Sequence, residues 1–145
     1  METVDKIMTK RVVTCSPNDS IMDAARKMRN KTISSVIVTV NNKPIGIVTE
    51  RDFTKKVVSV NLDTKKHEVK EIMTKPVISI PPETNIYYAN EYMQKKGFRR
   101  FPITNKKGEL VGIITQRDLL NYFTTQRKKF VMQSLSKELR ESYPI

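Results

Sequence analysis

Two seven-residue stretches of this chain end a short β-branched run with a threonine, and a carboxylate follows three residues later. They are residues 46–52 (GIVTERD) and 112–118 (GIITQRD), which share glycine, isoleucine, threonine, arginine and aspartate at the same positions. The pattern predicts a strand that stops at a glycine-supported edge and a helix that begins at once. Its recurrence indicates that both copies serve one purpose.

The Thr-x-x-Asp spacing has two explanations, and these residues alone leave both open. In the first, Thr49 and Thr115 cap the helices that follow, while Asp52 and Asp118 complete capping boxes and favour the helix dipole. In the second, the free N–H groups of the helix start bind a phosphate, and the short carboxylate accepts both hydroxyls of a ribose. The pattern therefore indicates either two helix caps or two sites for a nucleotide-like ligand.

An internal repeat organises the rest of the chain around these stretches. An offset of 65 residues aligns residues 7–10 (IMTK) with residues 72–75 (IMTK). After one inserted residue near Gly108 the offset becomes 66, and the two seven-residue stretches align. A period of this length, present twice, indicates two copies of one supersecondary unit that bury their faces against each other.

Each copy predicts the same helix after a short extended run, which covers residues 12–15 in the first copy. In the first copy Ser20 ends a turn and caps a helix that begins at Ile21, where apolar residues start to recur at helical spacing. In the second copy a turn over residues 81–85 precedes a helix that ends in two lysines and Gly97.

A hairpin and a closing helix complete each copy. The hairpin strands are expected over residues 35–40 and 44–49 in the first copy, and over 100–104 and 109–115 in the second, with asparagine and glycine at the turns. The closing helices are expected to begin at Glu50 and Gln116.

The repeat divides the chain into four segments: a first unit over residues 1–58, a polar linker over 59–70, a second unit over 71–123 and a helical tail over 124–145. In the tail Val131, Leu135 and Leu139 recur at i, i+4 and i+8, which predicts a helix with one apolar stripe. The stripe either folds back on the second unit, which we favour, or pairs with another chain.

Bulk composition bounds the class of protein. At 145 residues the chain has the size of one compact domain or of two halves that share a core. No apolar run approaches the ~20 residues that cross a bilayer, and the first residues are too polar for a secretory signal. The single cysteine, Cys15, suits a cytoplasmic chain and is expected to be a small buried hydrophobe. The net charge of +12 is spread along the chain and indicates a basic surface or attraction to polyanions.

The residues give little support to an enzyme. The one histidine, His67, lies in the polar linker. The chain has no Cys/His cluster for zinc and no G-x-x-x-x-G-K-[ST] phosphate loop. Asp52 and Asp118 belong to separate copies, so they do not suggest a general acid/base pair. We expect a protein that is not an enzyme and that requires no cofactor or dedicated metal site.

A β-α-β-β-α unit that occurs twice, opened by Ile-Met-Thr-Lys and closed by Gly-Ile-[Val/Ile]-Thr-x-x-Asp, resembles the tandem CBS (cystathionine β-synthase) domain, or Bateman module. The resemblance covers residues 7–123. It implies an α+β fold in which two units pack sheet to sheet with pseudo-two-fold symmetry and leave two related clefts. In the family these clefts bind AMP, ADP, ATP or S-adenosylmethionine. Such pairs usually form disc-like homodimers, and they regulate the enzymes or transporters to which they are attached.

Carried over to this sequence, the resemblance assigns the second cleft to residues of both units. Asp118 would bind the ribose hydroxyls and Thr115 the ribose or phosphate oxygens, while Arg100 or Arg99 would meet the phosphates. The adenine would lie against apolar residues that come mainly from the opposite copy: Val12, Val13, Ile33 and, from the same copy, Ile113. Independently of the family, arginine offers phosphate a planar pair of donors, and an apolar slot for a purine adds burial at ~25 cal/mol per Å².

By the pseudo-symmetry, the first cleft would use Asp52 and Thr49, with the base among Ile47, Val77, Ile78 and Phe98. Here the sequence departs from the second copy, because Ser34 and Ser35 stand where the second copy has the two arginines. Unless those arginines reach across the axis, the first cleft lacks a phosphate clamp. We therefore expect the two clefts to differ in affinity and the cleft of Asp118 to be the tighter.

The leading hypothesis is a stand-alone cytoplasmic sensor that binds adenine nucleotides, acts as a homodimer and has no membrane association. Mg²⁺ could enter with ATP. The alternative is a nucleic-acid-binding protein that uses the basic surface of the second unit and the tail. The cations of that surface are Lys95, Lys96, Arg99, Arg100, Lys106, Lys107, Arg127, Lys128 and Lys129.

Overall fold

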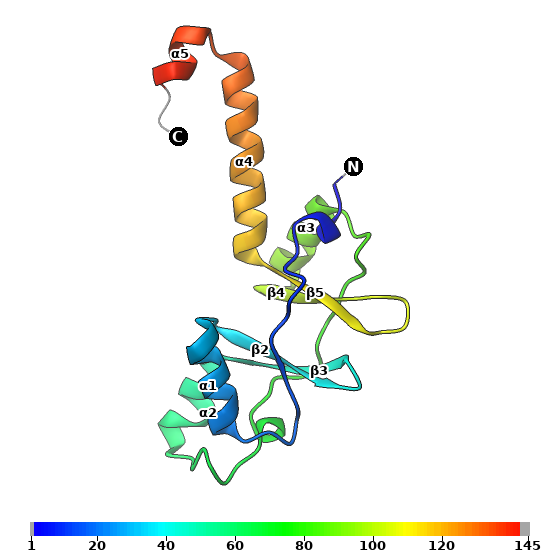
Figure 1. The fold of residues 1–145 in the computed structure, drawn as a ribbon, viewed down its shortest axis with the longest axis vertical. Helices are drawn as coiled ribbons and strands as arrows, with labels where there is room; N and C mark the ends of the chain where they lie inside the picture. Colours follow the sequence, from blue (N-terminus) through cyan, green and yellow to red (C-terminus); the bar gives the residue numbers. More distant parts are fainter. Residues whose placement is uncertain (1, 143–145) are drawn as a thin grey trace.

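The computed structural model describes residues 2–142, in which two small α+β units bring their sheets together in the middle of the molecule (Figure 1). Helices α1 and α2 lie beyond the first sheet, and α3 lies beyond the second. The predicted α+β class with two repeated units is confirmed. The elements are, in chain order, η1 (Val4–Lys6), β1 (Thr14–Cys15), α1 (Ile21–Lys31), β2 (Ser35–Val40), β3 (Lys43–Thr49), α2 (Glu50–Lys56), η2 (Val58–Val60), η3 (Val69–Glu71), α3 (Ile86–Lys96), β4 (Arg100–Thr104), β5 (Leu110–Thr115), α4 (Gln116–Ser134) and α5 (Lys137–Ser142), with η denoting a 3-10 helix.

Helices α1 and α3 begin at the predicted residues because a side chain caps each of them. The Ser20 hydroxyl accepts a hydrogen bond from the Asp23 backbone N–H at 3.0 Å. The Asn85 side chain accepts one from the Tyr87 backbone N–H at 2.8 Å. Helix α3 ends at Gly97, whose φ of 69° is the left-handed conformation that favours glycine.

The sheets follow the predicted hairpins. Strand β2 pairs with β3 antiparallel and with β1 parallel, and β4 pairs with β5 antiparallel. The counterpart of β1 in the second unit is reduced to one parallel bridge between Ile80 and Ile103. Pro81 follows this bridge and has no N–H with which to extend the ladder.

The segment before the first strand of each unit, its lead-in, packs on the opposite unit. In Figure 1 the N-terminal segment starts beside α3 and then runs past both sheets toward α1. Thr9 exchanges two backbone hydrogen bonds of 2.9 Å with Ile113 of β5. Thr74 makes the corresponding pair with Ile47 of β3, at 2.8 and 3.1 Å. The two halves are therefore joined by reciprocal backbone pairing as well as by their sheets.

The hydrophobic cores of the two units show the same exchange of lead-ins. Val69 and Ile72 are buried in the core of the first unit, together with α1, β2 and β3. Val4 is buried in the core of the second unit. The segment expected to be a linker is thus packed on the first unit, where Val69 N–H donates to the Asp19 carbonyl at 2.8 Å. The boundaries of the four segments stay a prediction.

The glycine that opens each seven-residue stretch makes room for the opposite lead-in. A Cβ on Gly112 would meet the Met8 side chain and would lie 3.1 Å from the Thr9 carbonyl oxygen. For a Cβ on Gly46 the nearest atoms all belong to the Met73 side chain, with Sδ at 2.6 Å. A methionine side chain can change rotamer, whereas the Thr9 backbone is held in its bridge to β5.

We therefore expect Gly112→Ala to lower the free energy of unfolding by about 1–3 kcal/mol through overpacking. Gly46→Ala, the matched control, should cost less. Urea unfolding of both variants measures the difference, and equal losses would contradict this account of the two glycines.

The expectation that the tail folds back on the second unit is not met. Helix α4 continues from Gln116 to Ser134 and extends away from the second unit (Figure 1). It contains no glycine or proline that would turn the chain. Leu119 is the one buried residue of α4, whereas the Phe130 side chain is 70% exposed and Leu139 in α5 is also exposed. Residues 143–145 of the predicted tail lie outside the described residues.

Cys15 is buried in the first core, which confirms the sequence-based interpretation. Burial raises the pKa of its thiol to about 11, with Lys27 lowering it and Asp19 raising it more weakly. A thiol with this pKa stays protonated at neutral pH, so Cys15 contributes as a small apolar side chain.

Candidate functional site

Two cavities lie where the units meet. The larger has a volume of about 990 Å³ and is bounded by residues after Thr9, by α1 and β2, and by the junction of β5 with α4. The smaller, of about 770 Å³, is bounded by the junction of β3 with α2, by residues 74–78 and by residues 97–102. Because of the exchanged lead-ins, each cavity is built from both units.

The structure brings together most of the residues predicted for each cleft. The larger cavity is lined by these residues of the predicted second cleft: Thr115, Arg100, Arg99, Ile113, Val12, Val13 and Ile33. The smaller is lined by these residues of the predicted first cleft: Thr49, Ile47, Val77, Ile78 and Phe98. Within residues 2–142 the exceptions are Asp118 and Asp52, which do not line either cavity. Each carboxylate is instead hydrogen-bonded to the threonine that does line its cavity.

Both carboxylates form the capping boxes that the spacing allows. The Thr115 backbone N–H donates to Asp118 Oδ2 at 2.9 Å, and the Asp118 N–H donates to Thr115 Oγ1 at 3.2 Å. The Thr49 backbone N–H likewise donates to Asp52 Oδ2 at 2.9 Å. The capping explanation is therefore realised in both copies, and any contact with a ligand would use the remaining lone pairs.

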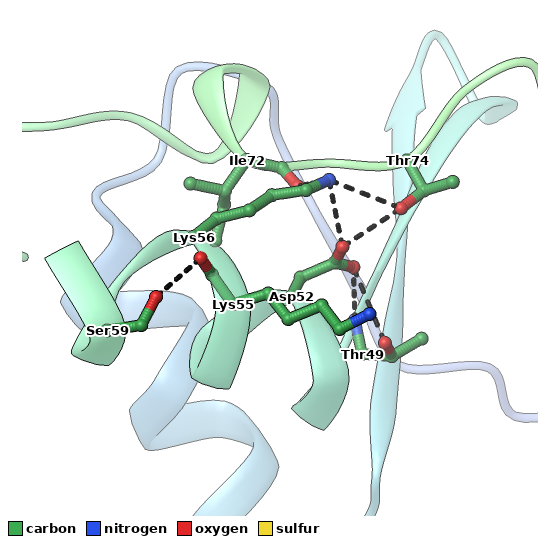
Figure 2. Close-up of polar contacts among 7 residues, drawn as sticks. All are labelled: Thr49, Asp52, Lys55, Lys56, Ser59, Ile72 and Thr74. Carbon is green, nitrogen blue, oxygen red and sulfur yellow. Dashed lines mark hydrogen bonds and ion pairs between the residues drawn. The ribbon is translucent and has the colours of Figure 1, made fainter.

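The environments of the two carboxylates differ. Asp52 is only 5% exposed. Its Oδ1 accepts a hydrogen bond from Thr74 Oγ1 and forms an ion pair with Lys56 Nζ, both at 2.9 Å (Figure 2). Lys56 Nζ also donates to the Ile72 carbonyl at 2.9 Å. Asp118 is partly exposed, and among the described residues no side chain donates to its Oδ1.

Two arginines at the start of β4 serve both cavities. Arg99, Arg100, Ser34 and Glu50 line the larger and the smaller cavity alike. Arg100 reaches across the axis to Ser34 of the first unit, and both arginines belong to the wall of the smaller cavity. The sequence left open whether they reach this cleft, and the smaller cavity is therefore not without arginines.

Arg100 is a half-buried cation with an unused donor. One terminal nitrogen lies 3.4 Å from Ser34 Oγ, and the buried Nε has no hydrogen-bond partner within the described part of the chain. Burial lowers the pKa of the guanidinium, Arg99 lowers it further and Glu50 opposes them. A guanidinium stays protonated at neutral pH even so. An anion in either cavity would restore part of the solvation that this charge has lost.

The larger cavity is also lined by cations that the sequence analysis did not assign to it. Arg11, Arg29 and Arg117 join Arg99 and Arg100, and Glu50 is the one acidic residue of that wall. Arg117 recurs as Arg51, which lines the smaller cavity, so the shared arginine of the two seven-residue stretches was a usable signal. Arg11 and Arg29 carried no such signal, because their partners in the cavity are distant in sequence.

The lead-in threonines are a second omission. Thr9 lines the larger cavity and Thr74 lines the smaller. Both belong to the repeated Ile-Met-Thr-Lys stretch, which marked the repeat but gave no reason to expect a threonine beside the opposite unit's helix start. The repeat therefore marked both threonines as equivalent, but only the exchange of lead-ins in the structure shows that they line the cavities.

Two further searches concern other kinds of site. Over residues 2–142, no group of three or more histidine, cysteine, aspartate or glutamate side chains is placed to hold a metal ion. Among the helices of that same range, none combines the length and the apolar character that crossing a bilayer requires.

Comparison with known proteins gives a consistent family. The CBS domain family model matches the chain twice, over residues 4–64 and 69–125. An uncharacterized protein from Methanopyrus kandleri is 35% identical over 141 residues, which cover 96% of this chain and 69% of that protein. An inosine-5'-monophosphate dehydrogenase from Methanocaldococcus jannaschii is 33% identical over 97% of this chain, but the match covers only 26% of the enzyme.

A solved structure shows the same arrangement of two units. It is a CBS domain pair in complex with 5'-methylthioadenosine and S-adenosyl-L-methionine, and it superposes with a TM-score of 0.78 at 27% identity. The superposition covers 87% of this chain and 98% of that one.

Proposed function

Since this chain belongs to the CBS domain family and carries two CBS domains in tandem, we propose that it is a regulatory module that binds an adenosine-containing ligand in its larger cavity. The observation that carries the proposal is the half-buried Arg100, whose Nε lacks a partner within residues 2–142, on a wall with four more arginines. A phosphate group supplies the acceptors that this wall lacks.

The rest of the larger cavity suits a nucleoside. Val12, Val13, Ile33 and Ile113 form apolar wall on which a purine can be buried, at ~25 cal/mol for each Å² of apolar surface removed from water. Thr115 lies beside them at the start of α4, where the positive end of the helix dipole favours an anion. Asp118 does not line the cavity itself, but it is hydrogen-bonded to Thr115, which does, and its partly exposed carboxylate keeps one oxygen that could accept a ribose hydroxyl.

The relatives support the two parts of the proposal separately. The CBS domain pair that was solved with two adenosine compounds supports the nucleoside part. The match to about a quarter of an inosine-5'-monophosphate dehydrogenase supports the regulatory part, because the chain corresponds to one segment of a larger enzyme.

The charge of the cavity orders the candidate ligands. Five arginines against one glutamate attract the phosphates of ATP, ADP and AMP, in that order of charge. The sulfonium and ammonium groups of S-adenosylmethionine are cationic and would be repelled. We therefore rank the nucleotides above S-adenosylmethionine, with Mg²⁺ entering only as the companion of ATP.

Thermal unfolding with AMP, ADP, ATP and S-adenosylmethionine tests the proposal. A ligand at ~100 times its dissociation constant should add about 2.7 kcal/mol to the free energy of unfolding, which corresponds to a rise in Tm of roughly 5–10 °C. The nucleotides should give the larger shifts. If none of the four compounds raises Tm at millimolar concentration, the proposed function is wrong.

Nucleic-acid binding remains the alternative, and of the cations predicted for it only Arg100 is partly buried. Arg99 and Arg100 also line the cavities, whereas Lys95, Lys106 and Lys128 do not. Exposed lysines are compatible with a solvated surface as well as with phosphate backbones. The half-buried guanidinium of Arg100, whose Nε has no partner within residues 2–142, favours a small ligand that can enter the cavity.

A further inference from the structure

The capping carboxylates of the two units are equivalent in sequence, and neither lines a cavity itself, but they differ in which of their oxygens are already bonded. Asp52 and Asp118 are related by the 66-residue offset, and both accept the backbone N–H of their capping threonine at 2.9 Å. Beyond that shared contact the two differ. Asp52 is buried against two further donors, whereas Asp118 is partly exposed and has an oxygen to which no described side chain donates.

Lys56 is the residue that makes the surroundings of Asp52 differ from those of Asp118. Its Nζ lies 2.9 Å from Asp52 Oδ1 and 2.9 Å from the Ile72 carbonyl, and Figure 2 shows it between the two. The lysine thereby bridges α2 to the lead-in that borders the smaller cavity. Thr74 Oγ1 occupies the same carboxylate oxygen at 2.9 Å.

The second unit has no lysine at the corresponding position. The 66-residue offset places Tyr122 there, four residues after Asp118 on helix α4. Residues four apart on a helix are neighbours, so a cation at this position would face Asp118 as Lys56 faces Asp52. A tyrosine carries no charge at neutral pH and leaves the carboxylate unpaired.

A ribose needs free acceptor lone pairs on a carboxylate, and the oxygens of Asp52 are already hydrogen-bonded. To accept two adjacent hydroxyls, a carboxylate must present free lone pairs on an accessible edge, and its negative charge strengthens both bonds. Both oxygens of Asp52 are occupied, its charge is neutralised by Lys56, and it is 5% exposed. Displacing Lys56 would leave a buried carboxylate and the ammonium without their partners, which is costly.

We propose that Lys56 determines the specificity of the module by occupying Asp52, the carboxylate behind Thr49 on the wall of the smaller cavity, so that the chain takes one adenosine-containing ligand and takes it in the larger cavity. This inference rests on the proposed function and adds a stoichiometry and a cause to it. The cause is distinct from the arginines, which line both cavities.

Titration calorimetry with ATP on reciprocal variants tests the inference. The wild-type chain should bind one ATP. Lys56→Tyr, which gives the first unit the residue of the second, should bind two. Lys55→Tyr is the matched control, because Lys55 is exposed and its side chain is not part of the network around Asp52; it should still bind one. Two sites in the wild type, or one site in a Lys56→Tyr variant that melts cooperatively, would overturn the inference.

The opposite exchange keeps the test decisive if Lys56→Tyr does not fold. Tyr122→Lys should pair with Asp118 and weaken ATP binding in the larger cavity at least tenfold. The control Leu120→Lys adds the same charge at an exposed position two residues from Asp118, which faces another side of the helix, and should not weaken binding. Unchanged ATP affinity in Tyr122→Lys, or an equal loss in Leu120→Lys, would overturn the role of this position. If neither the wild type nor any variant binds ATP, this inference fails, and the proposed function fails with it only when AMP, ADP and S-adenosylmethionine do not bind either. A wrong stoichiometry alone removes only the inference.

Discussion

Replacing Ile72 by alanine should lower the free energy of unfolding by about 2–5 kcal/mol, the cost of emptying a buried isoleucine site. Ile72 is 1% exposed and packs in the core of the first unit, although the repeat places it at the start of the second. The same substitution at Ile7, its equivalent in the first repeat, should cost less because Ile7 is only partly buried against the second core. Urea unfolding monitored by circular dichroism measures both.

A double-mutant cycle locates the contribution of Ile72. If the lead-ins are exchanged, Ile72→Ala and Val48→Ala, both in the first core, should show an interaction energy of more than about 0.5 kcal/mol. Ile72→Ala and Ile114→Ala, which lies in the second core, should be additive. Coupling to Ile114 instead of Val48, or a loss for Ile7→Ala larger than that for Ile72→Ala, would contradict the exchange.

Arg100→Ala should weaken the binding of ADP by about 10–100-fold and leave the binding of adenosine unchanged, because a hydrogen bond to a charged group contributes roughly 1.5–3 kcal/mol. Arg127→Ala, which removes an exposed cation from α4, is the matched control and should have little effect. Titration calorimetry with both compounds measures the two affinities. An equal loss for ADP and adenosine would show that Arg100 acts through the shape of the cavity and not through the phosphates.

The same variant should not be less stable without ligand. The Arg100 guanidinium is half-buried, its pKa is lowered chiefly by burial, and its Nε lacks a partner within the described residues. A group in this state costs desolvation without a compensating bond. Arg100→Ala should therefore leave the free energy of unfolding unchanged or raise it. A loss of stability comparable to that of Ile72→Ala would mean that Arg100 serves the fold.

Sequence predicted well those elements whose ends are determined by local chemistry. Ser20 and Gly97 mark helix ends through a side-chain cap and a left-handed backbone, and both features can be read from a few neighbouring residues. The hairpins could be predicted for the same reason. The direction of the tail was misjudged because an apolar stripe shows that a helix has one apolar face, but not what that face contacts.

Features that depend on contacts distant in sequence could not be predicted. The repeat showed that Thr9 and Thr74 are equivalent, but not that each pairs with a strand of the opposite unit. Arg11 and Arg29 line the larger cavity only because α1 and the segment before β1 face the second unit. The apolar wall of each cleft was anticipated from the family resemblance and not from spacing, since spacing carries no information about packing across the two units.

The two carboxylates show where a repeat misleads. Identical spacing predicted identical roles for Asp52 and Asp118, and their capping boxes are indeed the same. Their surroundings differ because Lys56 and Tyr122 stand one helical turn later, outside the matched stretch. The prediction of a tighter second cleft rested on arginines that line both cavities, so its support now comes from the carboxylates instead.

A crystal structure of the chain grown with ADP tests the central claim most directly. We expect the nucleotide in the larger cavity, with its base against Val12 and Ile113 and a phosphate oxygen within hydrogen-bond distance of Arg100. A larger cavity that stays empty at saturating ADP, or a nucleotide bound outside it, would contradict the account.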